Sequence, residues 1–97
     1  MKFEDFNSTL KDRKPPENIS QNLLALWYDG NGQWARAHQI VQDIENKDAA
    51  WIHAYLHRKE GDEGNAGFWY RKAGKTHCKM TLEKEWETLV IHFLSLN

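Results

Sequence analysis

Apolar side chains recur along most of this chain at the three- and four-residue spacing that places them on one face of an α-helix. Residues 33–46 are the clearest case, because Trp34, Ala37, Val41 and Ile44 share one face of a helix there. No run of residues alternates between apolar and polar side chains with the period of two that a half-buried strand requires. The pattern therefore predicts an all-α protein.

Turn and capping residues divide this pattern into separate helices. The cluster from Asp29 to Gly32 and the pair Gly61 and Asp62 have strong turn chemistry. Between these turns we expect helices in residues 17–28, 33–46, 49–60 and 63–73, and a last helix after residue 81. The expected N-terminal caps are Asn18 with Gln21 as a capping box, Asp48, and Thr81.

Two glycines lie inside the predicted helix 63–73. Gly64 and Gly67 weaken a helix by about 1 kcal/mol each relative to alanine. We therefore expect them to serve the close approach of another backbone.

The N-terminal segment, residues 1–16, is predicted to be an arm or one short helix lying on the body. Its apolar residues recur at helical spacing: Phe3, Phe6 and Leu10. Pro15 and Pro16 end this segment, since proline disfavours helix in the residue before it. Residues 17–97 then form a single helical-repeat domain.

Composition describes an ordinary globular chain. Its 97 residues are 40% hydrophobic and 28% charged, which fits one domain with an adequate core. The five tryptophans fall one to a predicted helix, as expected if each helix adds one large side chain to a shared core: Trp27, Trp34, Trp51, Trp69 and Trp86.

Charge and cysteine content limit the function classes. A net charge of −1 argues against a general affinity for nucleic acid, which requires a basic surplus or patch. No apolar run is long enough to span a membrane, and residues 1–10 lack the apolar segment of a secretory signal. The single Cys78 excludes an internal disulfide and fits a reducing cytoplasm. We expect a cytoplasmic protein that binds neither nucleic acid nor membrane.

The chain also contains an internal repeat. An offset of 29 residues aligns Gly32 with Gly61, and the same offset pairs small residues elsewhere: Ala25 with Ala54, and Ala37 with Ala66. Small residues therefore recur where the two helices of a hairpin must approach each other.

This repeat resembles the tetratricopeptide repeat. In the first copy the matching residues are Leu24, Ala25, Tyr28, Gly32, Trp34 and Ala37, and in the second they are Ala54, Gly61, Ala66 and Tyr70. The resemblance implies two antiparallel helical hairpins in a right-handed array, with the last helix as a cap over the second hairpin. The chain also looks like small helical bacterial proteins without an assigned activity, so the resemblance implies a fold and not a reaction.

His53 and His57 are the first candidates for chemistry. They are four residues apart and share a helix face, the geometry in which two imidazoles bind one metal ion. A third ligand would come from His38, His77 or Cys78, and the ligand types favour zinc. The alternative is structural, because both positions face the partner helix, where a half-buried histidine packs its ring and makes one hydrogen bond. On this pattern we predict no cofactor and no catalytic activity.

The central helix offers a second candidate site. In tetratricopeptide-like arrays its outer face usually lines a concave groove. We predict that a protein or peptide partner, or a second copy of this chain, binds there through Leu26, Asp29, Trp51, Tyr55, Arg58 and Lys59. The alternative is burial of the central helix on all sides. The sequence therefore favours a small protein-interaction module, with a metal-binding protein or enzyme using His53 and His57 as the alternative.

Overall fold

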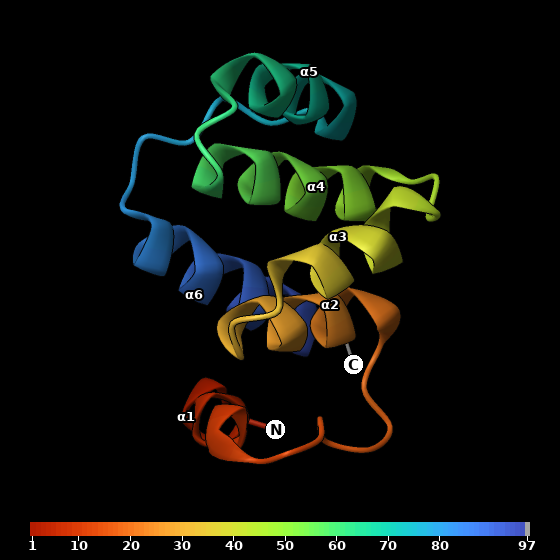
Figure 1. Cartoon of the computed structure of the whole chain (residues 1–97), viewed down its shortest axis with the longest axis vertical. Coiled ribbons are helices and arrows are strands. Elements are labelled where there is room, and N and C mark those ends of the chain that lie inside the picture. Colours follow the sequence, from red (N-terminus) through yellow and green to blue (C-terminus); the bar gives the residue numbers. More distant parts are fainter. Residues whose placement is uncertain (97) are drawn as a thin grey trace.

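The computed structural model describes residues 1–96, so Asn97, the last residue of the predicted domain, lies outside it. These residues form helices and no strand, which confirms the all-α prediction (Figure 1). The elements are α1 (Phe3–Ser8), the 3₁₀ helix η1 (Thr9–Lys11), α2 (Gln21–Gly30), α3 (Trp34–Gln42), α4 (Lys47–Lys59), α5 (Glu63–Ala73) and α6 (Leu82–Leu94). Within residues 1–96 no helix combines the length and the apolar character needed to cross a membrane.

The helix starts differ from the sequence prediction at two places. Helix α2 begins at Gln21 because the Ser20 hydroxyl accepts a hydrogen bond from the N–H of Leu23, and Asn18, with φ 62°, is not helical. Helix α4 begins at Lys47 because the Asn46 side chain, and not that of Asp48, accepts the capping hydrogen bond from the N–H of Ala49. Helix α3 ends at Gln42, four residues before the predicted end at residue 46. Thr81 caps α6 as predicted.

The turn between α2 and α3 has the same pattern of backbone hydrogen bonds as the turn between α4 and α5. In the first, the N–H groups of residues 31, 32 and 33 donate to the carbonyls of residues 27, 29 and 28. In the second, residues 60, 61 and 62 donate to residues 56, 58 and 57, each 29 positions later. The glycine of each turn is left-handed, with φ 85° at Gly32 and 87° at Gly61. The offset of 29 residues is thus present in the backbone as well as in the sequence.

Consecutive helices pack in pairs, α2 with α3 and α4 with α5. Helix α6 lies against α1, α2 and α4 (Figure 1). It therefore closes the face shared by both pairs, where the sequence led us to expect a cap over the second pair. The N-terminal arm is helical, and Phe6 of α1 is completely buried.

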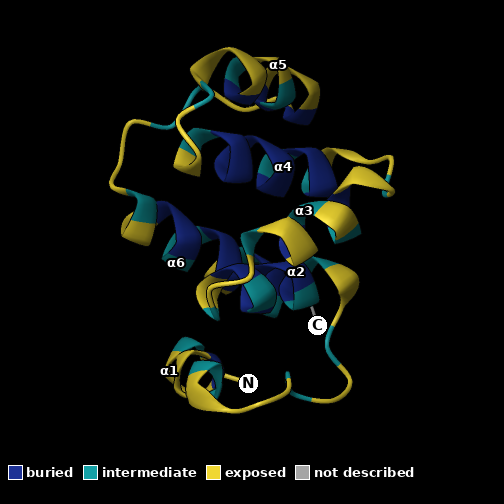
Figure 2. Ribbon diagram, viewed as in Figure 1, coloured by how far each residue is buried: buried dark blue, intermediate teal, exposed yellow. Residues whose placement is uncertain are grey.

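The main core lies between α1, α2, α3, α4 and α6, and Figure 2 shows that α4 is buried along most of its length. A smaller cluster of Ala54, Ala66 and Tyr70 joins α4 to α5. Each of helices α2 to α6 carries one tryptophan, as predicted. The Trp86 indole is held in place because its N–H donates to the carbonyl of Leu26 at 3.0 Å.

One glycine allows a close approach, and it is not one of the two predicted. A Cβ added at Gly30 would lie 2.8 Å from Cζ2 of Trp86 and 2.9 Å from Cδ2 of Leu10. At Gly64 the nearest atom would be 3.9 Å away, and at Gly67 the nearest would be a terminal nitrogen of Arg71. The expectation for Gly64 and Gly67 is therefore wrong, because both face open space or a flexible side chain.

Replacing Gly30 by alanine should overpack the contact between α2, η1 and α6. The Trp86 ring cannot yield easily because it is buried and hydrogen-bonded, so we expect a loss of about 1–3 kcal/mol in the free energy of unfolding, measured by urea denaturation. Gly64→Ala is the control and should cost nothing. Equal tolerance of both substitutions would contradict the close packing at Gly30.

Candidate metal centre

Three of the six residues predicted to bind a partner are buried. Leu26 is 0% exposed, and Asp29 and Tyr55 are each 2% exposed. The prediction that all three side chains are exposed for a partner is therefore wrong, although Asp29 and Tyr55 form part of the wall of the groove beside α1. The physical reason is α6, which packs against α2 and α4 and covers this side of the central helix.

The other three predicted residues are held by internal contacts. Trp51 is half-buried against His92 and Phe93 of α6, and Nζ of Lys75 lies 4.2 Å from its ring centroid. The Arg58 Nε donates to Oε1 of Glu85 at 3.0 Å. Lys59 is exposed, but its Nζ donates to Oδ1 of Asp29 at 2.9 Å.

These charges belong to a buried network centred on two carboxylates. Asp29 also accepts a hydrogen bond from the Tyr55 hydroxyl at 2.7 Å. Glu85 of α6 is 1% exposed and accepts one from the Tyr70 hydroxyl at 2.6 Å. Each carboxylate is thus matched by one cationic side chain and one tyrosine, which offsets much of the cost of burying its charge.

The tyrosines act as fixed donors. Burial raises the pKa of Tyr55, and the neighbouring Asp29 carboxylate raises it further. Burial followed by the hydrogen bond to Glu85 raises the pKa of Tyr70 in the same way. Both hydroxyls therefore stay protonated, and this network holds α2, α5 and α6 to the central helix.

The histidines converge at a different place. His38 of α3 joins His53 and His57 of α4, and one ring nitrogen from each of the three lies within 4.8 Å of the others. The Nε2 atoms of His38 and His53 are 3.0 Å apart, so one ring donates a hydrogen bond to the other. Of the three partners considered from sequence, His38 is thus the one in place. His77 instead bonds Glu63 at 2.9 Å.

Local structure fixes these rings. A separation of four residues puts His53 and His57 on one face of α4, and their rings stack at 4.9 Å. Trp69 of α5 stacks on His53 at 3.9 Å, and Trp34 of α3 stacks on His38 at 5.0 Å. His53 and His57 are 5% and 9% exposed and His38 is half-buried, so the cluster reaches the surface through His38.

The environment keeps two of the imidazoles neutral. Burial, followed by the proximity of His38 and His57, lowers the pKa of His53 to about 4. Burial and the nearby His57 also lower the pKa of His38. A neutral imidazole has a free electron pair, so these rings can bind a metal ion near neutral pH without first losing a proton.

A carboxylate orients the third ring. Nδ1 of His57 lies 2.7 Å from Oε1 of Glu60, three residues along the chain. When Nδ1–H donates to this carboxylate, Nε2 remains as the acceptor. Metal-binding histidines in proteins commonly have such a partner, which fixes the tautomer and makes the other nitrogen more basic.

The spacing fits a transition metal. Zinc binds imidazole nitrogen at about 2.0–2.1 Å, so two ligand nitrogens in a tetrahedral site lie about 3.3 Å apart. The Nε2 atoms of His38 and His53, 3.0 Å apart, are already close to this separation. The ring nitrogens of the three histidines lie within 4.8 Å of one another, so small ring rotations would bring all of them to it. Three such ligands would leave one coordination position for water.

The sequence pointed to His53 and His57 but left the third ligand open, and it missed Glu60. Two local signals existed. His38 follows Trp34 by four residues and so belongs to the inward face of α3. Glu60 follows His57 by three residues, within reach on a helix.

Comparison with protein-family models, with curated proteins and with solved structures gave no match to this chain. The resemblance to the tetratricopeptide repeat therefore stays a prediction.

The tyrosine hydroxyls of the buried network should carry measurable stability. Removing one leaves a buried carboxylate short of a donor, so Tyr55→Phe and Tyr70→Phe should each lower the free energy of unfolding by about 1.5–3 kcal/mol. Tyr28→Phe is the control, since the Tyr28 hydroxyl bonds no other residue of the described chain and should cost little. Losses no larger than that of Tyr28→Phe would show that the network contributes little.

Acid should destabilise the metal-free protein through His53. Its pKa is about 4 in the folded state and near 6.5 in the unfolded state, so between these values only the unfolded state binds the proton. The free energy of unfolding, measured by urea denaturation with a chelator present, should fall as pH drops from about 6.5 to 4. In His53→Gln this loss should be smaller, whereas His92→Gln should retain it. An unchanged loss in His53→Gln would contradict the assignment.

Proposed function

We propose that the protein binds one divalent transition-metal ion, zinc by ligand type, through His38, His53 and His57. The observation that carries this proposal is the convergence of three imidazoles from two helices, with ring nitrogens within 4.8 Å of one another. Imidazole suits zinc, copper, nickel and iron, and zinc accepts three histidines without a strong geometric demand.

Repulsion between protonated imidazoles in the histidine cluster supports the same proposal. Three rings packed together can share few protons, because each added charge repels the others in a partly buried place. A metal ion supplies a positive charge that all three nitrogens face at once. Glu60 then balances part of that charge through His57.

Metal binding would join the two helix pairs. His38 belongs to the α2 and α3 pair, whereas His53 and His57 belong to the α4 and α5 pair. An ion held by all three therefore stabilises the folded chain, since the unfolded chain does not bring these residues together. The absence of catalytic activity expected from sequence stays a prediction.

Binding of a protein partner is a second prediction with less support. Leu26, Asp29 and Tyr55 are buried, and Arg58 and Lys59 already pair with internal carboxylates. None of these five side chains is free to anchor a partner, so the metal-binding proposal is preferred.

The cytoplasmic location and the bacterial source expected from sequence stay predictions. A free, half-buried Cys78 fits a reducing compartment. Imidazole ligands do not depend on the redox state, so the proposed metal site fits that compartment as well.

Calorimetry tests the proposal: zinc is titrated into chelator-treated protein at about pH 7.5, and the melting temperature is then measured with and without the ion. We expect one ion per chain and a rise in the melting temperature, because about 100-fold excess of ion over Kd adds about 2.7 kcal/mol. Replacing zinc by cobalt should give the visible absorption of a tetrahedral site. No binding, or a cobalt spectrum of the hydrated ion, would refute the proposal.

Histidine variants assign the ligands. His38→Gln and His53→Gln should each lose most of the zinc affinity, and Glu60→Gln should weaken it by about 10- to 100-fold. His77→Gln is the matched control, because His77 also pairs with a glutamate but lies outside the cluster. Equal losses in His77→Gln and His53→Gln would place the ion elsewhere.

A further inference from the structure

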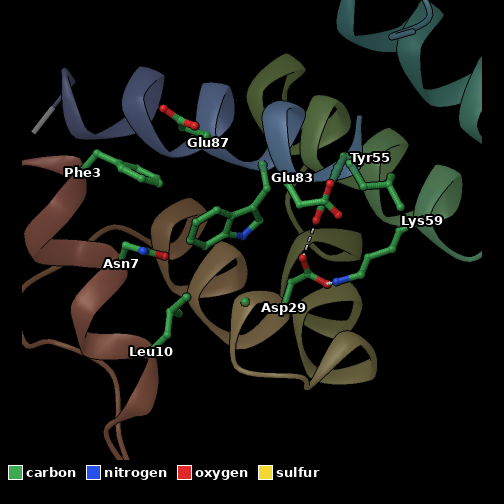
Figure 3. A pocket seen from close by; sticks show the side chains of 11 residues that line it. Phe3, Asn7, Leu10, Asp29, Tyr55, Lys59, Glu83 and Glu87 are labelled. Carbon is green, nitrogen blue, oxygen red and sulfur yellow. Dashed lines mark hydrogen bonds and ion pairs between the residues drawn. The ribbon is translucent and has the colours of Figure 1, made fainter. Parts of the chain in front are cut away.

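A groove of about 460 Å³ lies between the N-terminal arm and the body of the protein. Figure 3 shows Phe3, Asn7 and Leu10 of the arm on one side and Asp29 and Lys59 on the other. Its volume is in the range of small-molecule sites. None of the clustered histidines lines it, so it is independent of the proposed metal site.

The walls of the groove are largely apolar. Phe3, Leu10, Leu82 and Trp86 form them, and the rings of Phe3 and Trp86 meet edge to face with centroids 5.8 Å apart. The hydrogen bond from the Trp86 indole to Leu26 fixes this ring before any ligand arrives. The groove therefore offers a rigid aromatic surface to an apolar group.

The charge of the groove is negative. Glu83 and Glu87 lie four residues apart on α6 and line the groove, and neither forms an ion pair within residues 1–96 (Figure 3). The third carboxylate, Asp29, is matched by Lys59 at 2.9 Å. Glu83 is exposed and Glu87 is half-buried, so two unmatched negative charges lie at the rim of a largely apolar groove and attract a cation to it.

We propose that this groove binds a small organic ammonium ion with an apolar or aromatic body. The body packs on the Phe3 and Trp86 rings, and the ammonium group lies by the carboxylates of Glu83 and Glu87. Aromatic faces also attract a cation directly. An organic anion would meet the two unpaired carboxylates, and a bare metal ion would gain nothing from the apolar walls.

Three probes with the same phenyl body and different charge test the proposal. They are phenethylammonium, 2-phenylethanol and 3-phenylpropionate, titrated into the full chain in a low-salt buffer with a chelator and followed by two-dimensional NMR. Phenethylammonium should bind at least about tenfold more tightly than either other probe, and added salt should weaken it. Equal binding of the three, tighter binding of the propionate through Lys59, or no binding would overturn the proposal.

Two sets of variants locate the site. Glu83→Gln with Glu87→Gln should abolish the preference for the ammonium probe and lower the melting temperature only slightly, since Glu83 lies in the first turn of α6. Glu17→Gln with Glu45→Gln removes the same charge from exposed positions outside the groove and should keep the preference. Asn7→Trp places a large ring at the exposed edge of the groove and should weaken all three probes. A preference that survives in the Glu83 and Glu87 variant would refute the proposal.

Discussion

The fold depends on two buried carboxylates that are both held by the central helix. Asp29 of α2 and Glu85 of α6 lie on different helices, yet α4 supplies Tyr55 and Lys59 to the first and Arg58 to the second. A buried charge without its partner costs several kcal/mol, so each pair specifies one packing of its helices against α4. This network fixes the positions of α2 and α6, and through the hydrogen bond from Tyr70 also that of α5.

The same helix has a second polar face, and the two faces differ in how their charges are matched. On the carboxylate face every buried charge has a partner of opposite sign. On the histidine face, His53 and His57 meet His38, and within residues 1–96 the carboxylate next to these rings is that of Glu60 at the edge. A set of converging imidazole nitrogens without a matching cation favours a metal ion, whereas a matched ion pair does not. For this reason the histidine face carries the proposed function.

The groove beside α1 follows from the same packing. Helix α6 uses Glu85 and Trp86 for the interior, and its neighbouring residues Glu83 and Glu87 line the groove beside the arm. Lys59 lies on the far side but is committed to Asp29. Within the described chain Glu83 and Glu87 are therefore unpaired because the two cations of α4, Arg58 and Lys59, pair with the buried carboxylates Glu85 and Asp29.

The sequence by itself determined the features that depend on neighbouring residues. The helices, the cap at Thr81, the paired turns at Gly32 and Gly61, and the shared face of His53 and His57 all follow from spacing within a few residues.

Only the tertiary structure decided which helix covers which face. The position of α6 turned the predicted binding residue Tyr55 into a core residue, and the packing of α3 on α4 selected His38 as the third histidine. Such pairings join residues that are 15 or more positions apart. Local patterns cannot assign these contacts, because burial depends on the whole set of helix contacts and not on the spacing within one helix.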